Sequence, residues 1–325
     1  MRGAVRARRL SGLRVTAGVV LAREGSSFRV HTDGGVIAAV LRGRLKHEDG
    51  ARVVAGDVVE LASIADGRAT ITAVRPRRSV LARRAVGGGA VGRAQPIAAN
   101  IDQVVVVAAA RDPEPNPRML DRFLVIAAAN GLPAVLVLNK IELDRSVADR
   151  LARRLEPAGY QVVPVSVKVP EGLPALRDLL RARASVLTGP SGAGKSSLVN
   201  ALQPGLRLRI GEVNAKGGKG RHTTRAALLV PLPELGGGYV VDTPGLREVG
   251  AWGVPPDALG ACFPEFRRFL DGCRFDNCRH LAEPNCAVRQ AARDGAFDAD
   301  RLVSYQRIYA ELSEPSWSTA RRRGR

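Results

Sequence analysis

The sequence predicts an α/β fold, in which a parallel sheet flanked by helices lies between a small β-barrel and a helical module. Three observations predict it. Short β-branched segments separated by turn residues occupy residues 12–75, apolar runs of strand length alternate with helical segments over residues 100–246, and three cysteines and a histidine gather within residues 273–286. The 325 residues are enough for two or three domains, each with a buried core.

The N-terminal part predicts a barrel of the OB type, because its six candidate strands are rich in β-branched residues and are separated by Gly or Asp-Gly turns. The candidate strands begin at Gly12, Gly18, Ser27, Val36, Asp57 and Ala69. Phe28 is the one aromatic residue between residues 12 and 79, so we do not expect bases to stack on the barrel. Contact with RNA would depend on backbone charge and shape.

The next segment, residues 76–99, is rich in Arg and Gly and predicts a mobile linker. Beyond it, continuous apolar runs are typical of buried parallel strands. Strands are expected at residues 101–107, 134–138, 162–165 and 184–187, and helices at residues 118–130 and 173–183. The predicted domains are a basic tail (1–11), the barrel (12–75), the linker (76–99), the α/β domain (100–246) and a C-terminal module with a basic tail (247–325).

A phosphate-binding loop is predicted where a strand gives way to a helix. It consists of Gly189, Pro190, Ser191, Gly192, Ala193, Gly194, Lys195, Ser196 and Ser197. The three glycines let backbone N–H groups approach phosphate oxygens, and the following helix adds the positive end of its dipole. Lys195 supplies a charge for the β and γ phosphates, and the Ser196 hydroxyl is a ligand for Mg²⁺. The alternative is a Gly-rich turn without a ligand.

A guanine-binding element is predicted at the end of the strand over residues 134–138. The Asn139 amide can reach the guanine carbonyl and N7, the Lys140 stem can cover the ring, and Glu142 can accept from N1–H and the amino group. After the next strand, Ser166, Val167 and Lys168 resemble the Ser-Ala-Lys element that touches the base in GTPases. We therefore expect GTP or GDP as the bound nucleotide.

Two further segments match the parts of a GTPase that sense the γ-phosphate. Residues 211–225 are rich in Gly and basic residues, as expected of a segment that Mg²⁺ and γ-phosphate order. Either Thr223 or Thr224 is expected to complete the Mg²⁺ shell, with Thr224 favoured. Asp242 is expected to hold Mg²⁺ through water, and the Gly245 N–H to point at the γ-phosphate.

The order of these motifs is unusual, because the guanine element at Asn139 comes 50 residues before the phosphate loop at Gly189. A doubly wound sheet tolerates this order, since its stability depends on which strands are neighbours rather than on where the chain begins. The motifs in this order, with residues 218–224 similar to the family's switch I, resemble the circularly permuted ribosome small subunit-dependent GTPase A family. Glu142 departs from the aspartate usual there.

The resemblance implies a circularly permuted P-loop GTPase domain that hydrolyses GTP to GDP and phosphate late in maturation of the small ribosomal subunit. Stimulation by that subunit and contact with its rRNA are implied as well. Leu246 stands where many GTPases place a water-orienting Gln, and Leu cannot hydrogen-bond water. We therefore expect His222 to assist hydrolysis, together with Lys195 and Gly245. The alternative is that His222 is structural or contacts rRNA.

The cysteine cluster predicts one structural zinc ion in a C-terminal helical module. Cys273, Cys278, His280 and Cys286 offer four soft or borderline ligands, which suits tetrahedral Zn²⁺. A cytosolic chain would not normally form disulfides, and a histidine between cysteines is hard to explain by a disulfide. Cys262 is expected to be a buried thiol, and residues 287–312 to be largely helical and to pack around the zinc loop.

The formal net charge of +19 suggests a polyphosphate partner. Arginines without acidic neighbours number four in residues 1–11 and six in residues 75–93, and four more stand in residues 321–325. The alternative is a basic protein with solvated ends. The chain has no apolar run of roughly 18 residues and no signal peptide, so we expect a cytoplasmic protein without a membrane partner. We also expect a monomer, and no DNA partner.

Three other functions fit parts of the sequence. The first is a GTP-regulated protein that acts on another RNA or protein target. The second is a non-enzymatic RNA-binding module with a vestigial nucleotide site. The third is a nucleotide kinase, which would leave the segment from Asn139 to Glu142 without a role.

Overall fold

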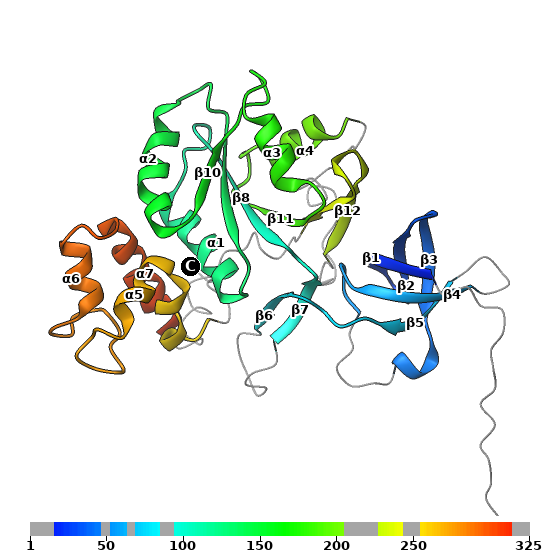
Figure 1. Ribbon diagram of the computed structural model, residues 1–325, viewed down its shortest axis with the longest axis horizontal. Coiled ribbons are helices and arrows are strands. Elements are labelled where there is room, and N and C mark those ends of the chain that lie inside the picture. Colours follow the sequence, from blue (N-terminus) through cyan, green and yellow to red (C-terminus); the bar gives the residue numbers. More distant parts are fainter. Residues whose placement is uncertain are drawn as a thin grey trace, which may run out of the picture.

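The computed structural model describes residues 16–46, 53–63, 69–84, 94–204, 227–242 and 254–313. These residues form a closed barrel, a six-stranded sheet with helices on both faces, and a C-terminal helical module. In Figure 1 the barrel and the C-terminal module lie on opposite sides of the sheet domain. This arrangement confirms the predicted fold class.

The barrel closes in the order β1-β2-β3-β5-β4. Its strands are β1 (Thr16–Glu24), β2 (Ser27–Thr32), β3 (Gly35–Leu41), β4 (Val58–Ser63) and β5 (Ala69–Val74), and the 3₁₀ turn η1 (Gly43–Lys46) follows β3. Two of the predicted strands, beginning at Gly12 and Gly18, correspond to the single strand β1, and residues 12–15 lie outside the described part. Phe28 is 2% exposed and packs in the barrel core.

The predicted mobile linker over residues 76–99 is wrong for most of its described residues. β6 (Val80–Arg84) and β7 (Ala94–Ala99) form an antiparallel hairpin. Leu81 and Ala98 are fully buried in a core shared with the sheet domain. The prediction from composition failed because the Arg- and Gly-rich stretch also contains two short apolar segments. These segments are buried by residues from distant parts of the chain.

Three of the arginines expected to be unpaired have acidic partners. Arg77 makes two hydrogen bonds to the fully buried Asp57, at 2.7 and 2.9 Å. Arg75 lies 3.4 Å from Glu60, and Arg78 lies 3.0 Å from Asp102. These carboxylates are distant in sequence, so the local run of basic residues could not reveal them.

The central sheet has the order β10-β9-β8-β11-β13-β12, and β12 is its one antiparallel member. Its strands are β8 (Gln103–Ala109), β9 (Ala134–Asn139), β10 (Gln161–Pro164), β11 (Ala184–Thr188), β12 (Leu228–Leu232) and β13 (Gly238–Asp242). All seven residues of β8 are buried. The predicted parallel α/β sheet is therefore confirmed.

Helices cover both faces of the sheet. One face carries α1 (Pro117–Ala129) and α2 (Ser146–Leu155), and the other carries α3 (Leu173–Leu180) and α4 (Lys195–Leu202). The 3₁₀ turns η2 (Glu156–Ala158) and η3 (Pro233–Leu235) lie in the connections. Val104 and Val106 pack toward α1 and α2, whereas Val105 and Val107 pack toward α3 and α4. This alternation explains why β8 is apolar throughout.

The C-terminal module packs on α1. Its elements are η5 (Pro256–Ala258), η6 (Gly260–Cys262), η7 (Pro264–Phe266), α5 (Arg267–Leu270), α6 (Ala287–Arg293) and α7 (Ala299–Ser313). The segment predicted to be largely helical thus forms two helices, and Cys262 is buried as predicted. Val125 of α1 belongs to the module's core. No helix among the described residues is long and apolar enough to cross a membrane.

A buried ion cluster joins the module to the sheet domain. Asp121 of α1 accepts hydrogen bonds from Arg154 of α2 at 2.6 Å and from Arg301 of α7 at 2.6 Å. Arg301 also donates to Glu265 at 2.5 Å. All four side chains are buried. Helices from both domains are therefore held together by charges that have no access to water.

Candidate functional site

The predicted nucleotide-binding elements meet at one edge of the sheet. Because β8, β9, β10, β11 and β13 run parallel, their carboxyl ends lie at the same edge. Asn139 is the last residue of β9, Ser166 follows β10, the phosphate loop follows β11, and Asp242 is the last residue of β13. The rotated order along the chain therefore produces a single site.

The glycines of the phosphate loop occupy positions that exclude other residues. Gly189, Gly192 and Gly194 have positive φ angles of 132°, 80° and 89°. A Cβ atom at Gly189 would lie 2.0 Å from the Val107 carbonyl oxygen. A Cβ atom at Gly194 would lie 2.2 Å from Asn139 Nδ2. These residues are glycine because the loop passes directly against two neighbouring strands.

Lys195 begins α4 and folds back over the phosphate loop. Its ammonium donates hydrogen bonds to the carbonyls of Gly189 at 2.8 Å and Pro190 at 2.7 Å. The side chain is buried. The ammonium is thus held against the backbone of the predicted phosphate loop. Ser191 and Ser197 are exposed, Ser196 is half-buried, and Ala193 is part of the core.

Asn139 connects the guanine element directly to the phosphate loop. Its Nδ2 donates a hydrogen bond to the Ala193 carbonyl at 3.0 Å. Its Oδ1 is buried and has no hydrogen-bond partner among the described residues. A buried acceptor without a donor is uncommon in folded proteins. The orientation of this amide leaves one acceptor for a ligand at the point where the two motifs meet.

The remaining base-binding candidates follow β9 and β10, which are neighbouring strands of the sheet. Lys140 has a φ angle of 61°, and its ammonium donates a hydrogen bond to the Asp112 carbonyl. Glu142 is exposed. Ser166 is fully buried, and its hydroxyl accepts a hydrogen bond from the Val169 N–H at 3.0 Å. Val167 packs against the core, and Lys168 is exposed.

Sequence analysis missed the segment that follows β8. Asp112 accepts the hydrogen bond from Lys140, and a Cβ atom at Gly192 would lie 3.2 Å from Pro113 Cδ. These two residues therefore contact both nucleotide motifs. The signal available in the sequence was the position of Asp112 and Pro113 just beyond an apolar strand, at the edge where parallel strands place their sites.

Several predicted site residues lie outside the described part of the chain. They are His222, Thr223, Thr224 and Gly245, together with Leu246. Asp242 is described as the last residue of β13, next to β11 in the sheet. Strand β13, which ends at Asp242, thus lies beside β11, the strand that leads into the phosphate loop.

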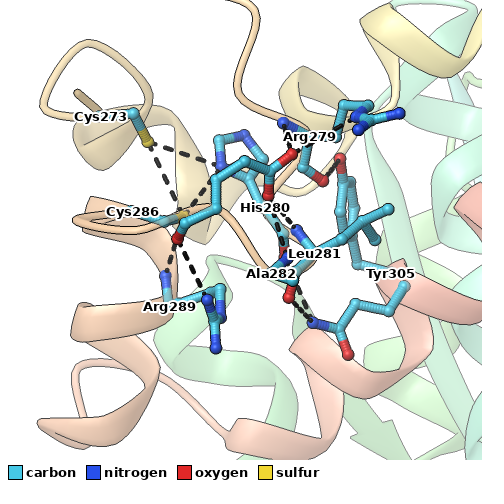
Figure 2. Close-up of polar contacts among 10 residues, drawn as sticks. Cys273, Arg279, His280, Leu281, Ala282, Cys286, Arg289 and Tyr305 are labelled. Carbon is cyan, nitrogen blue, oxygen red and sulfur yellow. Dashed lines mark hydrogen bonds and ion pairs between the residues drawn. The ribbon is translucent and has the colours of Figure 1, made fainter. Parts of the chain in front are cut away.

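The second candidate site is the predicted zinc cluster. The ligand atoms of Cys273, Cys278, His280 and Cys286 all lie within 4.8 Å of one another. Cys273 Sγ is 3.9 Å from Cys286 Sγ and 3.6 Å from His280 Nδ1, and His280 Nδ1 is 3.3 Å from Cys286 Sγ (Figure 2). A tetrahedral Zn²⁺ site separates two sulfurs by about 3.8 Å, and a sulfur from a nitrogen by about 3.5 Å. The four residues therefore fit a zinc ion.

The protonation of the cluster's side chains is coupled to the binding of a cation. Burial and the neighbouring Cys286 raise the pKa of the Cys278 thiol to about 12, and burial also raises the pKa of Cys286. Burial lowers the pKa of His280, which favours the neutral imidazole. Thiols so placed stay protonated without a metal, whereas a divalent cation favours thiolates. Binding of a divalent cation would therefore release protons from the cysteines, whereas His280 already favours the neutral form that ligates a metal.

The loop that carries His280 is fixed by hydrogen bonds from its own backbone. The Glu283 carboxylate accepts from the N–H groups of Arg279, Leu281 and Ala282 at 3.0, 2.8 and 3.1 Å. Burial alone would raise the pKa of Glu283, but these donors lower it to about 2. The Tyr305 hydroxyl donates to the Arg279 carbonyl at 2.9 Å (Figure 2). Helix α7 therefore supports the loop from outside the cluster.

Comparison with known proteins shows the family. A family model described as RsgA GTPase matches residues 74–252. A relative from Gemmatimonas aurantiaca, named small ribosomal subunit biogenesis GTPase RsgA, is 50% identical over 303 residues, which cover 91% of this chain and 97% of the relative. A relative of the same name from Moorella thermoacetica is 38% identical over 295 residues, covering 91% of this chain and 97% of the relative.

Solved structures agree. YjeQ from Thermotoga maritima has a TM-score of 0.76 at 31% identity, covering 92% of this chain and 99% of that one. YloQ, described as a circularly permuted GTPase, has a TM-score of 0.71 at 26% identity, covering 95% of this chain and 98% of that one. The rotated motif order, the single site that it builds and these matches together show that the chain belongs to the RsgA GTPase family.

Proposed function

We propose that this chain hydrolyses GTP to GDP and phosphate in the late biogenesis of the small ribosomal subunit, and that the subunit stimulates hydrolysis. The observation that supports the proposal most directly is the hydrogen bond from Asn139 to the Ala193 carbonyl. It joins the predicted guanine element to the predicted phosphate loop, although the two motifs stand in rotated order along the chain. The relatives that match over nine-tenths of the chain are named for this process. Their names supply the partner, and the site supplies the chemistry.

In this proposal the nucleotide is held by residues at or just after the ends of three strands, β9, β10 and β11. Asn139 and Glu142 bind the guanine edge, Lys140 covers the ring, and the segment of Ser166, Val167 and Lys168 closes its far side. Backbone N–H groups of the phosphate loop and the Lys195 ammonium bind the phosphates. Lys195 exchanges its two carbonyl partners for phosphate oxygens when nucleotide binds.

Magnesium fits the oxygen donors expected at the phosphates. The hydroxyls of Ser196 and Thr224 would hold it directly and Asp242 through water, because Mg²⁺ prefers hard oxygen ligands. When bound with GTP, the ion neutralises charge on the β and γ phosphates. The Gly245 N–H is proposed to face the γ-phosphate, and His222 to orient the attacking water.

The experiment that tests the function is GTP hydrolysis by the full chain with and without purified small ribosomal subunits. We expect multiple turnovers and a clear increase in rate with small subunits. Large subunits serve as the control, in both hydrolysis and co-sedimentation. Equal behaviour with both subunits would favour another target, and the absence of turnover with either would favour a binding module. We further propose that the protein acts as a cytoplasmic monomer, and that rRNA is its contact on the subunit.

Nucleotide selectivity follows from the amide and the carboxylate of the guanine element. We expect GDP and GTP to displace labelled GDP at concentrations at least roughly 10²-fold lower than the concentration of ATP that is needed. The reason is that adenine lacks the N1–H and the amino group from which Glu142 accepts hydrogen bonds. The variant Glu142→Asp is expected to keep this preference, since the carboxylate remains. Displacement of GDP by ATP at similar concentration would contradict the assignment.

A structural role is proposed for zinc, since Cys273, Cys278, His280 and Cys286 fill all four tetrahedral positions and leave none for a substrate. We expect about one zinc ion per chain, measured by elemental analysis of protein purified without chelator. The variant Cys278→Ala is expected to lose the ion and to expose residues 273–286 to protease, because the loop depends on the metal. Cys262→Ala is the matched control.

That control removes a buried thiol outside the cluster, and it is expected to retain about one zinc ion per chain. Full zinc content in Cys278→Ala would show that the ion is bound elsewhere.

A further inference from the structure

A groove of about 310 Å³ lies between α1 and α7, at the seam between the sheet domain and the C-terminal module. Its rim carries Arg118, Arg122, Arg307 and Glu311, and its floor includes Met119 and Ile308. We call it the arginine groove. It contains none of the nucleotide or zinc candidates.

The side chains that line the groove carry a net positive charge. Three guanidinium groups face one carboxylate, and Glu311 pairs with Arg122. Arg118 and Arg307 are exposed. Within the described residues, the Arg118 side chain has no hydrogen-bond or ion-pair partner. Two positive charges therefore remain available to a ligand, beside the N-terminus of α1, whose dipole adds to the attraction.

The groove is built on a rigid base. Asp121 of α1 binds Arg301 of α7 at 2.6 Å, and both side chains are buried directly beneath the seam. Arg118 and Arg122 stand one turn apart on α1, about 6 Å along the helix axis. Because the buried pair fixes α7 against α1, Arg307 is held opposite these two. The helix positions that carry the three arginines therefore have a fixed spacing, although the exposed side chains of Arg118 and Arg307 have none imposed on them.

We propose that the arginine groove binds the phosphodiester backbone of RNA across the seam. Guanidinium groups match phosphate oxygens in charge and in planar hydrogen-bond geometry. The apolar floor of Met119 and Ile308 offers a surface against which a ribose can pack. An RNA strand in this groove contacts both domains at once, so it stabilises their docking. The identity of the RNA as small-subunit rRNA rests on the proposed function.

The test compares two double variants of the full chain. Arg118→Ala/Arg307→Ala removes the two available charges. Arg150→Ala/Arg153→Ala removes two exposed arginines from α2 and serves as the matched control. Affinity is measured for protein-free rRNA extracted from small subunits, at several salt concentrations, and binding to intact small subunits is measured by co-sedimentation.

The groove variant is expected to bind rRNA at least roughly tenfold more weakly near physiological salt, with the slope of log affinity against log salt reduced by about two. The control is expected to stay within about twofold of the wild type. Equal thermal midpoints and zinc contents would show that both variants are folded. Wild-type affinity and slope in the groove variant would overturn the proposal.

A third variant distinguishes phosphate binding from a structural role of the arginines. Glu311→Gln removes the one carboxylate among the residues that line the groove, and with it the ion pair between Glu311 and Arg122. Binding to rRNA is expected to become tighter by roughly threefold or more, with a steeper salt dependence. A role in packing alone would leave affinity unchanged or reduced, and that result would count against the proposal.

Two outcomes separate this inference from others. If the groove variant loses affinity for intact subunits but not for protein-free rRNA, the groove binds an acidic protein segment, and the RNA proposal is wrong. If wild-type GTP hydrolysis does not respond to small subunits while the groove variant still loses rRNA affinity, the proposed function fails and the groove stands as an RNA site.

Discussion

Replacing Arg301 with alanine is expected to lower the free energy of unfolding by about 3–5 kcal/mol, because the change leaves the buried Glu265 carboxylate without Arg301 and Asp121 with one of its two arginines. Arg301 is 1% exposed and hydrogen-bonds both Asp121 and Glu265. Burial alone would lower the pKa of Arg301, but the two carboxylates outweigh it and raise its pKa. Its guanidinium also lies 4.7 Å from the centroid of the Phe263 ring. Calorimetric unfolding of the zinc-loaded protein measures the effect.

The control for this prediction replaces both members of one ion pair. In Arg301→Leu/Glu265→Leu, Asp121 keeps its two hydrogen bonds from Arg154, at 2.8 and 2.6 Å, and the Glu265 carboxylate is gone. This double variant is expected to recover more than half of the lost stability, since apolar residues can replace a buried ion pair. If the double variant is less stable than Arg301→Ala, packing rather than unpaired charge explains the loss.

The variant His222→Ala is expected to lower subunit-stimulated GTP turnover by roughly 10²-fold or more, the usual effect of losing a positioned proton or water acceptor. Leu246 cannot orient the attacking water, so a group from the switch is needed. A neutral imidazole just before Thr223 and Thr224 is the titratable group nearest in sequence to the expected Mg²⁺ ligands. Single-turnover hydrolysis on purified small subunits measures the change.

Binding measurements in the same variant provide the control. Affinities for GTP and for small subunits are expected to stay close to wild type, because His222 is assigned to the reaction and not to the nucleotide phosphates. Hydrolysis at the wild-type rate would show that rRNA or a backbone group of the switch orients the water. Parallel loss of GTP affinity would show instead that His222 orders the nucleotide site.

The backbone conformation of the predicted phosphate loop could be anticipated from the sequence, because it depends on local residue types. Gly189 and Gly194 are required by positive φ angles and by contacts of 2.0 and 2.2 Å that a Cβ atom would make. A positive φ angle or a close backbone contact selects glycine, so the spacing of glycines in the sequence reports these requirements directly. The apolar run of β8 likewise predicted a buried parallel strand, because both of its faces are covered.

In two segments the local sequence pattern did not predict the secondary structure that forms. The hairpin of β6 and β7 was predicted as a mobile linker, because Arg and Gly dominate its composition. Helix α2 was not predicted, although Val147, Leu151 and Leu155 follow a helical period and are buried. In both cases a few apolar residues decided the structure, and their burial depends on surfaces supplied by other parts of the chain.

The sequence alone determined which local motifs this protein carries: a predicted phosphate loop from Gly189 to Ser196, a predicted guanine element at Asn139, and a Cys/His cluster with the spacing of a zinc site. Only the tertiary structure decided which distant groups meet. It brought Asn139 against Ala193, and it paired Asp121 with Arg301, 180 residues away. Short motifs specify backbone geometry and the type of ligand. Ion pairs between two domains depend instead on how whole helices pack, so no local or periodic pattern in the sequence reveals them.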